Sequence, residues 1–398
     1  MTTLRSLARH LALEGNIRVL ALQTLISQLG FGMFYVIWQP YVLSTGVSVV
    51  GLGIIQSIIN LSTAVGLIFW GILSDQLGRK RVILVSNACR VIALIALMVS
   101  TNFAFLLVFA FFIGFSSLFM QANPARSALT SESVDSNRRA TAFSTLLFFS
   151  QITNTLVASA GGYLAVTLGY HSIFYICVAG DLVGLLLLGI FLKETLKDPA
   201  KEDAAQSTAS KLVDYLVPER SLAKLYLIMT VMGLGYGTTY SVFYGTLVDT
   251  YRFDPIQLGI LSTSFNLTWG VTSIPLGRLS DRIGRLPLLK ASWAAAFIAI
   301  LGFLASRSFE MFLLFNMISA LDTSFWLSAW MAYVAEKASS ERLSTVMGKL
   351  ESYVRWVGIP APWLGGLLYS SYGFAAPLVV QAICLTASGA LIFSLKEA

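Results

Sequence analysis

Twelve long apolar runs constrain this chain more than any other feature of its sequence. They lie at about residues 17–43, 50–73, 82–100, 103–124, 140–166, 173–192, 222–248, 257–279, 286–306, 309–334, 344–370 and 374–395. An α-helix needs about 20 apolar residues to cross a bilayer, and the runs have this length without the alternation typical of a barrel strand. The sequence therefore predicts an all-α integral membrane protein with twelve transmembrane helices in the lipid bilayer.

The composition excludes the other broad classes. Charged residues make up 12% of the chain and hydrophobic residues 56%, whereas about 25% of a soluble domain is charged. Disorder requires the opposite combination of low hydrophobicity and high charge. The chain has two histidines, and its three cysteines (Cys89, Cys177 and Cys384) lie far apart in apolar runs. We therefore expect no disulfide framework, no metal site and no cofactor.

Catalytic motifs are sparse as well. The sequence contains no Gly-x4-Gly-Lys-Ser/Thr loop, so ATP-driven pumping by this chain is not expected. One Ser-x-x-Lys spacing, Ser221 to Lys224, stands at the edge of a span without catalytic companions. An intramembrane enzyme would need a catalytic constellation within the spans, and we predict that the protein is not an enzyme.

The basic residues predict the orientation in the membrane. The chain has 27 lysines and arginines. Arg90 and Arg355 lie deep within runs, and Arg252 and Arg307 lie in loops on one side of the membrane. The other 23 lie in the loops of the opposite side or at the helix ends next to them. Cytoplasmic loops carry the excess of basic residues, so both termini should be cytoplasmic in a multi-pass protein of the plasma or inner membrane. The net charge of +7 is then a topology signal, and no nucleic-acid partner is expected.

The chain contains an internal repeat around a polar linker. Residues 193–221 form the longest polar stretch, and they separate an N-terminal six-span bundle (1–192) from a C-terminal one (222–398). The sequence from Gly71 to Arg81 recurs from Gly277 with an offset of 206, and residues 128–139 recur at 332–342 with an offset of 203 to 204. Two landmarks at nearly one offset indicate a duplicated six-helix unit. The repeated pattern comprises Gly71, Asp75, Gly78, Arg79, Lys80, Arg81, Glu132 and Arg139, then Gly277, Asp281, Arg282, Gly284, Arg285, Glu336 and Arg342.

The Gly-x-Leu-Ser-Asp-x-x-Gly-Arg-Lys-Arg sequence after the second run resembles the signature loop of the major facilitator superfamily. The resemblance covers essentially the whole chain. It departs from the family pattern at Gln76, and the second copy ends in Leu286-Pro287. Such a resemblance implies two pseudo-symmetric six-helix bundles that give alternating access to a central cavity, with the solute site near the midplane.

The repeated loop has two interpretations. As a cytoplasmic gate, Asp75 would accept hydrogen bonds from Arg79, from Arg139 or from backbone donors and so hold one conformation closed. As a charged loop, it would only fix the topology. The family resemblance favours the gate.

Ionisable residues inside the runs are candidates for function. Asp322 lies halfway along the tenth run, Arg355 is its candidate partner in the eleventh, and Asp181 and Arg90 lie in the sixth and third. The resemblance implies that spans 1, 4, 7 and 10 line the cavity, so Asp322 has the better claim to a transport role and Asp181 the poorer one. The alternative for Asp322 is a helix–helix hydrogen bond, and Arg90 is predicted to reach the cytoplasmic interface by snorkelling.

Polar and aromatic residues on the inner spans complete the candidate solute site. Residues four apart share a helix face, which groups Tyr236 with Tyr240 and Tyr244, and Asp322 with Trp326 and Trp330. The first and fourth runs add Gln28, Tyr35, Gln39, Gln121 and Asn123. A weakly charged, aromatic-lined pocket suits an amphipathic organic molecule or a sugar.

These features predict a secondary active transporter of a small organic solute, with proton-coupled export of amphipathic compounds as the leading form. The alternative is uptake or facilitated diffusion of a sugar or organic acid without proton coupling. The stretch from Phe109 to Gly114 in span 4 lacks the arginine that proton-coupled exporters usually carry, and the Pro-x-x-Gly-Gly run stands in span 11 and not in span 5. A non-transporting membrane sensor is a further class. We expect a monomer, with the solute and protons as its partners.

Overall fold

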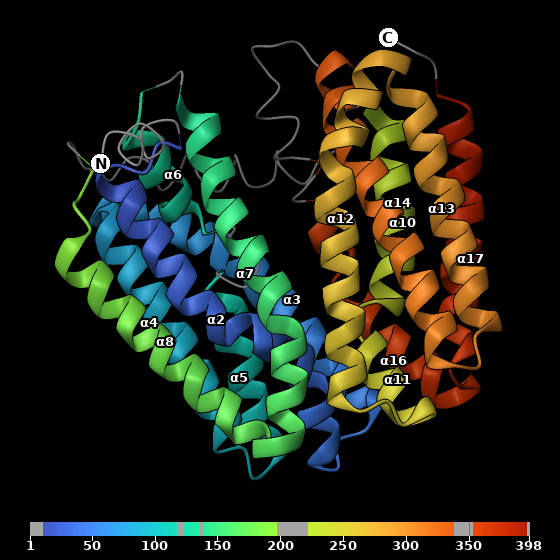
Figure 1. The fold of residues 1–398 in the computed structure, drawn as a ribbon, viewed down its shortest axis with the longest axis horizontal. Coiled ribbons are helices and arrows are strands. Elements are labelled where there is room, and N and C mark those ends of the chain that lie inside the picture. Colours follow the sequence, from blue (N-terminus) through green and yellow to red (C-terminus); the bar gives the residue numbers. More distant parts are fainter. Residues whose placement is uncertain are drawn as a thin grey trace. The chain divides into compact units, whose positions relative to one another are not determined.

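The computed structural model describes residues 11–117, 123–135, 138–196, 222–337, 350 and 353–395. These residues form α-helices and short connections (Figure 1). The helices are α2 (Gly15–Ser44), α3 (Val49–Leu77), α4 (Arg79–Met98), α5 (Phe103–Phe115), α6 (Pro124–Glu132), α7 (Arg139–Leu168), α8 (Tyr170–Phe191), α10 (Ala223–Thr239), α11 (Phe243–Tyr251), α12 (Pro255–Ile283), α13 (Arg285–Ala305), α14 (Phe309–Lys337), α16 (Ala361–Tyr372) and α17 (Ala375–Phe393).

Each of the twelve apolar runs contains one of these helices. Among the described residues, seven helices (α2, α3, α4, α8, α13, α14 and α17) are long and apolar enough on their own to cross a membrane. The fourth run contains α5 and ends where α6 begins, and the seventh is divided between α10 and α11. In the eleventh, a turn at residues 358–360 separates the helical residues 353–357 from α16. The helical runs are therefore confirmed in the described residues, although these three do not form one continuous helix each.

Local sequence explains where the helices begin and end. Asp254 accepts a hydrogen bond from the Gln257 backbone N–H at 2.8 Å and closes a capping box at the start of α12. Gly78 has φ +98°, which favours glycine, in the turn between α3 and α4. Asn123 caps α6 by accepting the Arg126 backbone N–H at 3.3 Å, and Pro124 occupies the first helical turn, where its missing N–H costs nothing.

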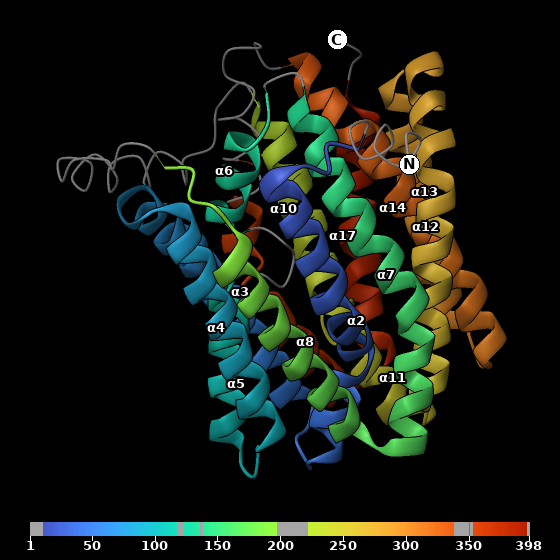
Figure 2. The same cartoon turned by 60° about the vertical axis from the view of Figure 1, so that its left-hand side comes forward.

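The chain divides into two compact units, residues 1–41 with 58–205 and residues 42–57 with 206–398. In the first unit, α4 packs against α5, α6 and α8 (Figure 2). In the second unit, α14 packs between α12 and α13, while α17 contacts α10, α13 and α16. The predicted domain boundaries at residues 192 and 222 flank residues 197–221, which lie outside the described part of the chain. These boundaries therefore stay a prediction.

The first half of α3 belongs to the second unit. The Trp363 backbone N–H donates to the Ser57 hydroxyl at 3.2 Å. A Cβ atom on Gly53 would lie 2.5 Å from the Pro362 carbonyl oxygen, and one on Gly366 would lie 2.8 Å from the Val49 carbonyl oxygen. These glycines therefore permit a backbone approach that no larger residue allows.

Candidate functional site

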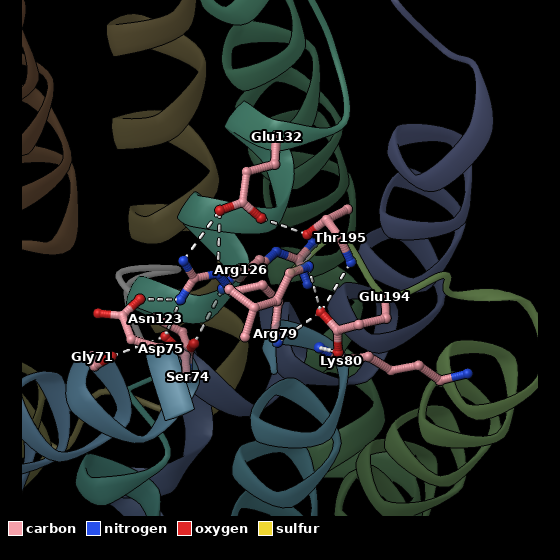
Figure 3. Close-up of polar contacts among 11 residues, drawn as sticks. Gly71, Ser74, Asp75, Arg79, Lys80, Asn123, Arg126, Glu132, Glu194 and Thr195 are labelled. Carbon is pink, nitrogen blue, oxygen red and sulfur yellow. Dashed lines mark hydrogen bonds and ion pairs between the residues drawn. The ribbon is translucent and has the colours of Figure 1, made fainter. Parts of the chain in front are cut away.

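The loop between α3 and α4 holds the Arg79 side chain in a network of acidic and polar groups (Figure 3). Arg79 is only 8% exposed. Its guanidinium forms an ion pair with Asp75, donates to the Ser74 hydroxyl at 2.9 Å and reaches Glu132 of α6 at 3.1 Å. Burial lowers the pKa of Arg79, but the hydrogen bonds and charges of Asp75 and Glu132 outweigh it, so the pKa is raised overall.

Glu194, just beyond α8, caps α4. Its carboxylate accepts the backbone N–H groups of Arg79 at 2.9 Å and of Lys80 at 3.0 Å. A Cβ atom on Gly78 would lie 2.5 Å from this carboxylate and would displace it, and the φ of Gly78 independently favours glycine. Burial raises the pKa of Glu194, but four backbone N–H donors outweigh it and hold the pKa below its usual range. The carboxylate is thus the anion that a helix N-terminus favours.

Two further contacts extend this network across the same end of the first unit. The Thr195 hydroxyl donates to the second oxygen of Glu132 at 2.5 Å. Asn16, in the first turn of α2, donates to the Ser133 hydroxyl at 3.1 Å and exchanges hydrogen bonds with the Lys193 backbone at 2.9 and 3.0 Å. Side chains of α2 and α6 and the backbone N–H groups that begin α4 are therefore tied to the segment that follows α8.

The second copy of the loop repeats the first at the atomic level. Arg285 pairs with Asp281 at 2.6 Å and donates to the Ser280 hydroxyl at 3.0 Å, as Arg79 does with Asp75 and Ser74. Gly284 has φ +92° and matches Gly78. The Glu336 side chain and Arg342 lie outside the described residues, so the second half of the repeated pattern stays a prediction there.

Of the three donors expected for Asp75, the structure selects Arg79. In the described part of the chain, the partner of the Asp75 carboxylate is the Arg79 guanidinium. Arg139 instead donates to the Ser131 carbonyl oxygen at 3.1 Å. Arg139 is part of the repeated pattern, but its side chain bonds to the backbone of α6 and not to Asp75.

Arg90 and Asp181 form a buried ion pair between α4 and α8. The Arg90 Nε donates to Asp181 at 2.7 Å, and a second bond joins the other guanidinium nitrogen to the other carboxylate oxygen. The two residues are 4% and 2% exposed, and the Phe31 ring lies 5.3 Å from the guanidinium carbon. The prediction that Arg90 snorkels to the interface is therefore wrong, because its counter-charge faces it from the neighbouring helix.

Asp322 lies in a polar pocket of the second unit and is 4% exposed. Its carboxylate accepts the Tyr236 hydroxyl of α10 at 2.5 Å and the Ser292 hydroxyl of α13 at 2.6 Å. These two hydroxyls are its partners in the described part of the chain, and Arg355, which lies in the helical turn 353–357, is not among them. The expected pair of Asp322 with Arg355 is therefore not formed among the described residues, and the Asp322 carboxylate makes hydrogen bonds to neighbouring helices instead.

The aromatic residues around Asp322 pack in pairs, as their spacing predicts. The Tyr236 and Tyr240 rings stack with centroids 5.5 Å apart, and the Trp326 and Trp330 rings stack at 4.6 Å. The Tyr240 hydroxyl lies 2.7 Å from the Ser319 hydroxyl. Tyr244 does not continue this face, because α10 ends at Thr239 and Tyr244 belongs to α11.

The candidates of the first unit are more dispersed. Gln28 of α2 donates to Asn154 of α7 at 2.6 Å. Gln39 is buried and Tyr35 half-exposed, while Asn123 serves as the cap of α6. Gln121 lies outside the described residues. The structure does not bring these side chains together into one cluster.

Sequence reasoning missed Arg126. This residue of α6 is 6% exposed, and its guanidinium donates to the Gln23 side chain at 2.6 Å, the Thr24 hydroxyl at 2.5 Å and the Leu20 carbonyl at 3.3 Å, all on α2. The expectation of a basic residue in the fourth run applied to residues 109–114, in the middle of the run. The available signal was an arginine in the first turn after the Asn123-Pro124 helix start.

The comparisons with known proteins agree with this architecture. The family model "Major Facilitator Superfamily" matches residues 20–233 and 225–398. Multidrug resistance protein MdtG of Dickeya zeae (strain Ech586) is 25% identical over 338 residues, covering 83% of this chain and 80% of that protein. Solute carrier family 22 member 18 of Rattus norvegicus is 25% identical over 343 residues, covering 84% and 83%.

Solved structures show the same fold. The nucleoside transporter NupG superposes with a TM-score of 0.74 at 14% identity, over 96% of this chain and 98% of that one. The human organic anion transporter MFSD10 superposes with a TM-score of 0.65 at 18% identity, over 95% and 98%.

A helical fold of this kind, with a repeated loop of the same geometry, defines a secondary transporter. The chain belongs to the major facilitator superfamily and has its twelve-helix fold. It is a multi-pass membrane protein that moves a small organic solute, and it is not an enzyme.

Proposed function

We propose that this transporter couples the movement of an amphipathic organic solute to protons and that Asp322 is the proton-carrying group. The observation that carries the proposal is a buried carboxylate bonded to two neutral hydroxyls, with no basic partner in the described part of the chain. An ionised carboxylate in such surroundings is costly, so the protonated form is favoured until water or a cation reaches it. Alternating access supplies that change of surroundings.

The solute class rests on the surroundings of Asp322 and on the relatives. Two stacked aromatic pairs next to a single ionisable group suit an amphipathic molecule better than a multiply charged one. Relatives named multidrug resistance protein support the export of such compounds. Uptake or facilitated diffusion of a sugar or organic acid is the second candidate, favoured by the absence of an arginine from the middle of span 4.

The test uses the purified protein in liposomes with an imposed pH gradient. Two fluorescent amphipathic dyes serve as probes, one cationic (ethidium) and one anionic (fluorescein). Accumulation of either dye against its gradient, accompanied by proton movement, supports the proposal. Movement only down the dye's own gradient, unaffected by the pH gradient, would leave facilitated diffusion as the better account.

We propose further that the Arg79 network gates the cytoplasmic side. Asp75→Asn removes one of the two carboxylates that hold the guanidinium, and the Asp75 side chain is 57% exposed, so folding should be retained. Only an interaction that differs between two conformations shifts their balance, so a gate predicts a changed transport rate at nearly unchanged thermal stability. Arg18→Gln, which removes an exposed charge from α2 outside the network, is the matched control and should transport at the wild-type rate. Wild-type rates in Asp75→Asn would leave the loop as a topology signal.

Glu194 gives this network a pH dependence. Its folded pKa lies below the ordinary value, so its stabilisation is present above that value and is lost as the pH falls through the folded pKa. We expect Glu194→Gln to lower the unfolding temperature at neutral pH, and the difference to close as the pH falls through the lowered folded pKa. Because the side chain is exposed, the effect should be about 1 kcal/mol or less. Glu14→Gln, at an exposed pair with Arg138 at 3.9 Å, is the control; a Glu194→Gln difference that is constant with pH would contradict the capping role.

We propose that both termini are cytoplasmic and that the protein resides in the plasma or inner membrane as a monomer. The basic residues support this orientation, since Arg252 and Arg307 alone fall in the opposite loops. Cysteine at position 252 or 307, in a chain without its three native cysteines, should react with an impermeant maleimide in intact cells. Labelling of both positions only after permeabilisation would reverse the topology.

A further inference from the structure

Arg126 is a buried cation whose partners are all neutral. Three oxygens of α2 accept its hydrogen bonds, from a side-chain amide, a hydroxyl and a backbone carbonyl. In the described part of the chain no carboxylate lies within ion-pair distance of its guanidinium. Residues 118–122, which precede α6 and are outside the described part, contain no acidic side chain either.

The neighbouring charges do not neutralise Arg126. Arg90 is close enough for its positive charge to act on Arg126, but Arg90 is already paired with Asp181 through both carboxylate oxygens. Among the described residues of the first unit, these two guanidiniums face one buried carboxylate, which leaves one excess positive charge. A buried charge without a counter-charge is strongly unfavourable, so a site of this kind attracts an anion.

The position of Arg126 in its helix adds to the attraction. It lies in the first turn of α6, directly after the Asn123 cap, at the end where the helix dipole is positive. A guanidinium has five N–H donors, and the three hydrogen bonds to α2 leave two N–H groups for a ligand. A carboxylate can accept two parallel N–H groups from one guanidinium.

We propose that Arg126 is the recognition residue for an anionic group of the transported solute, a carboxylate in the first instance. The inference rests on the proposed transport of an amphipathic solute and narrows that class to organic acids and zwitterions. Gln23 and Thr24 are positioning residues, because they hold the guanidinium against α2. The neutral partners let a solute anion bind without first displacing a protein carboxylate.

Binding of a matched pair of probes tests the proposal without any transport assay. Benzoate and benzamide have similar shapes, and only benzoate carries the charge. We expect benzoate to raise the unfolding temperature of the purified protein more than benzamide does. Loss of the charge-assisted hydrogen bonds in Arg126→Gln should weaken benzoate binding by about tenfold or more and leave the benzamide response unchanged.

The controls separate recognition from folding. Arg18→Gln removes an exposed arginine of α2 and should keep the wild-type preference for benzoate. If Arg126→Gln does not fold, Arg126→Lys replaces it. The lysine variant keeps the positive charge and should keep a preference for benzoate, and loss of that preference in a folded lysine variant would contradict recognition by charge.

Equal responses of the wild-type protein to the two probes would overturn the proposal, and so would an unchanged benzoate preference in Arg126→Gln. Neither result would bear on proton coupling, which depends on Asp322 in the second unit. Loss of pH-driven transport with an intact benzoate preference would in turn refute only the coupling.

Discussion

Replacing Asp322 by Asn should abolish pH-driven accumulation of the solute while leaving solute binding largely intact. The amide has nearly the shape of the carboxylate, so one of the two hydroxyls (Ser292 or Tyr236) keeps an oxygen to which it can donate, and the other faces the amide NH2, from which its oxygen can accept. The substitution removes the carboxylate that, among the described residues of this pocket, we propose to take up and release the proton. We therefore expect residual movement of the solute down its own gradient and no response to an imposed pH gradient.

Asp249→Asn is the matched control for this experiment. Asp249 is an exposed carboxylate of α11 in the same unit, and it also accepts a tyrosine hydroxyl, that of Tyr369 at 2.7 Å. Its replacement should leave pH-driven accumulation unchanged. The measurement is dye accumulation in liposomes at several imposed gradients, together with dye binding by the purified variant.

The outcomes for Asp322→Asn distinguish three roles. Lost binding with an unchanged pH response would make Asp322 a solute contact. Wild-type binding and a wild-type pH response would leave it as a packing residue of α14. A second variant, Tyr236→Phe, removes one donor to the carboxylate, so coupling through Asp322 predicts that it shifts the pH profile of transport without abolishing it.

The fold could be predicted from the sequence to the level of its spans because the bilayer imposes one length on every helix. The repeated loop was predictable for a different reason. Ser74, Asp75 and Arg79 lie within two turns of one another, as do Ser280, Asp281 and Arg285, so their contacts are local. The ends of α5 at Phe115 and of α10 at Thr239 were missed, because isolated polar residues such as Ser116 and Ser241 do not mark the end of a helix in a run of this length.

The contacts that the sequence did not predict join residues far apart in the chain. Glu194 reaches the start of α4 across 115 positions, and Arg126 reaches Thr24 across 102. An acidic residue at a helix end and a basic residue after a proline look like ordinary topology signals in the sequence alone. The Arg90–Asp181 pair shows the same limit, since both residues were recognised as buried ionisable groups but were considered separately.

That pair provides the second large effect, which is on stability. Asp181→Asn leaves the Arg90 guanidinium buried without its counter-charge, and breaking a buried pair from one side typically costs about 3–5 kcal/mol. We expect the variant to reach the membrane in much smaller amounts and to unfold at a much lower temperature in detergent. Arg90→Met should be similarly damaging, because it leaves the Asp181 carboxylate uncompensated.

The double variant Arg90→Met with Asp181→Leu tests the cause. It removes both charges and fills the space between α4 and α8 with apolar groups, so it should recover most of the stability that either single variant loses. Recovery of stability in the double variant is the behaviour expected of a charge pair. If the single variants lost stability only through packing, their two losses would add in the double variant. Asp75→Asn, which breaks an ion pair with a half-exposed carboxylate, is the control and should change the unfolding free energy by about 1 kcal/mol or less. If Asp181→Asn were as stable as that control, the Arg90 guanidinium would have to find another partner or be reached by water. Arg90 could then no longer be counted among the buried charges that leave Arg126 without a counter-ion.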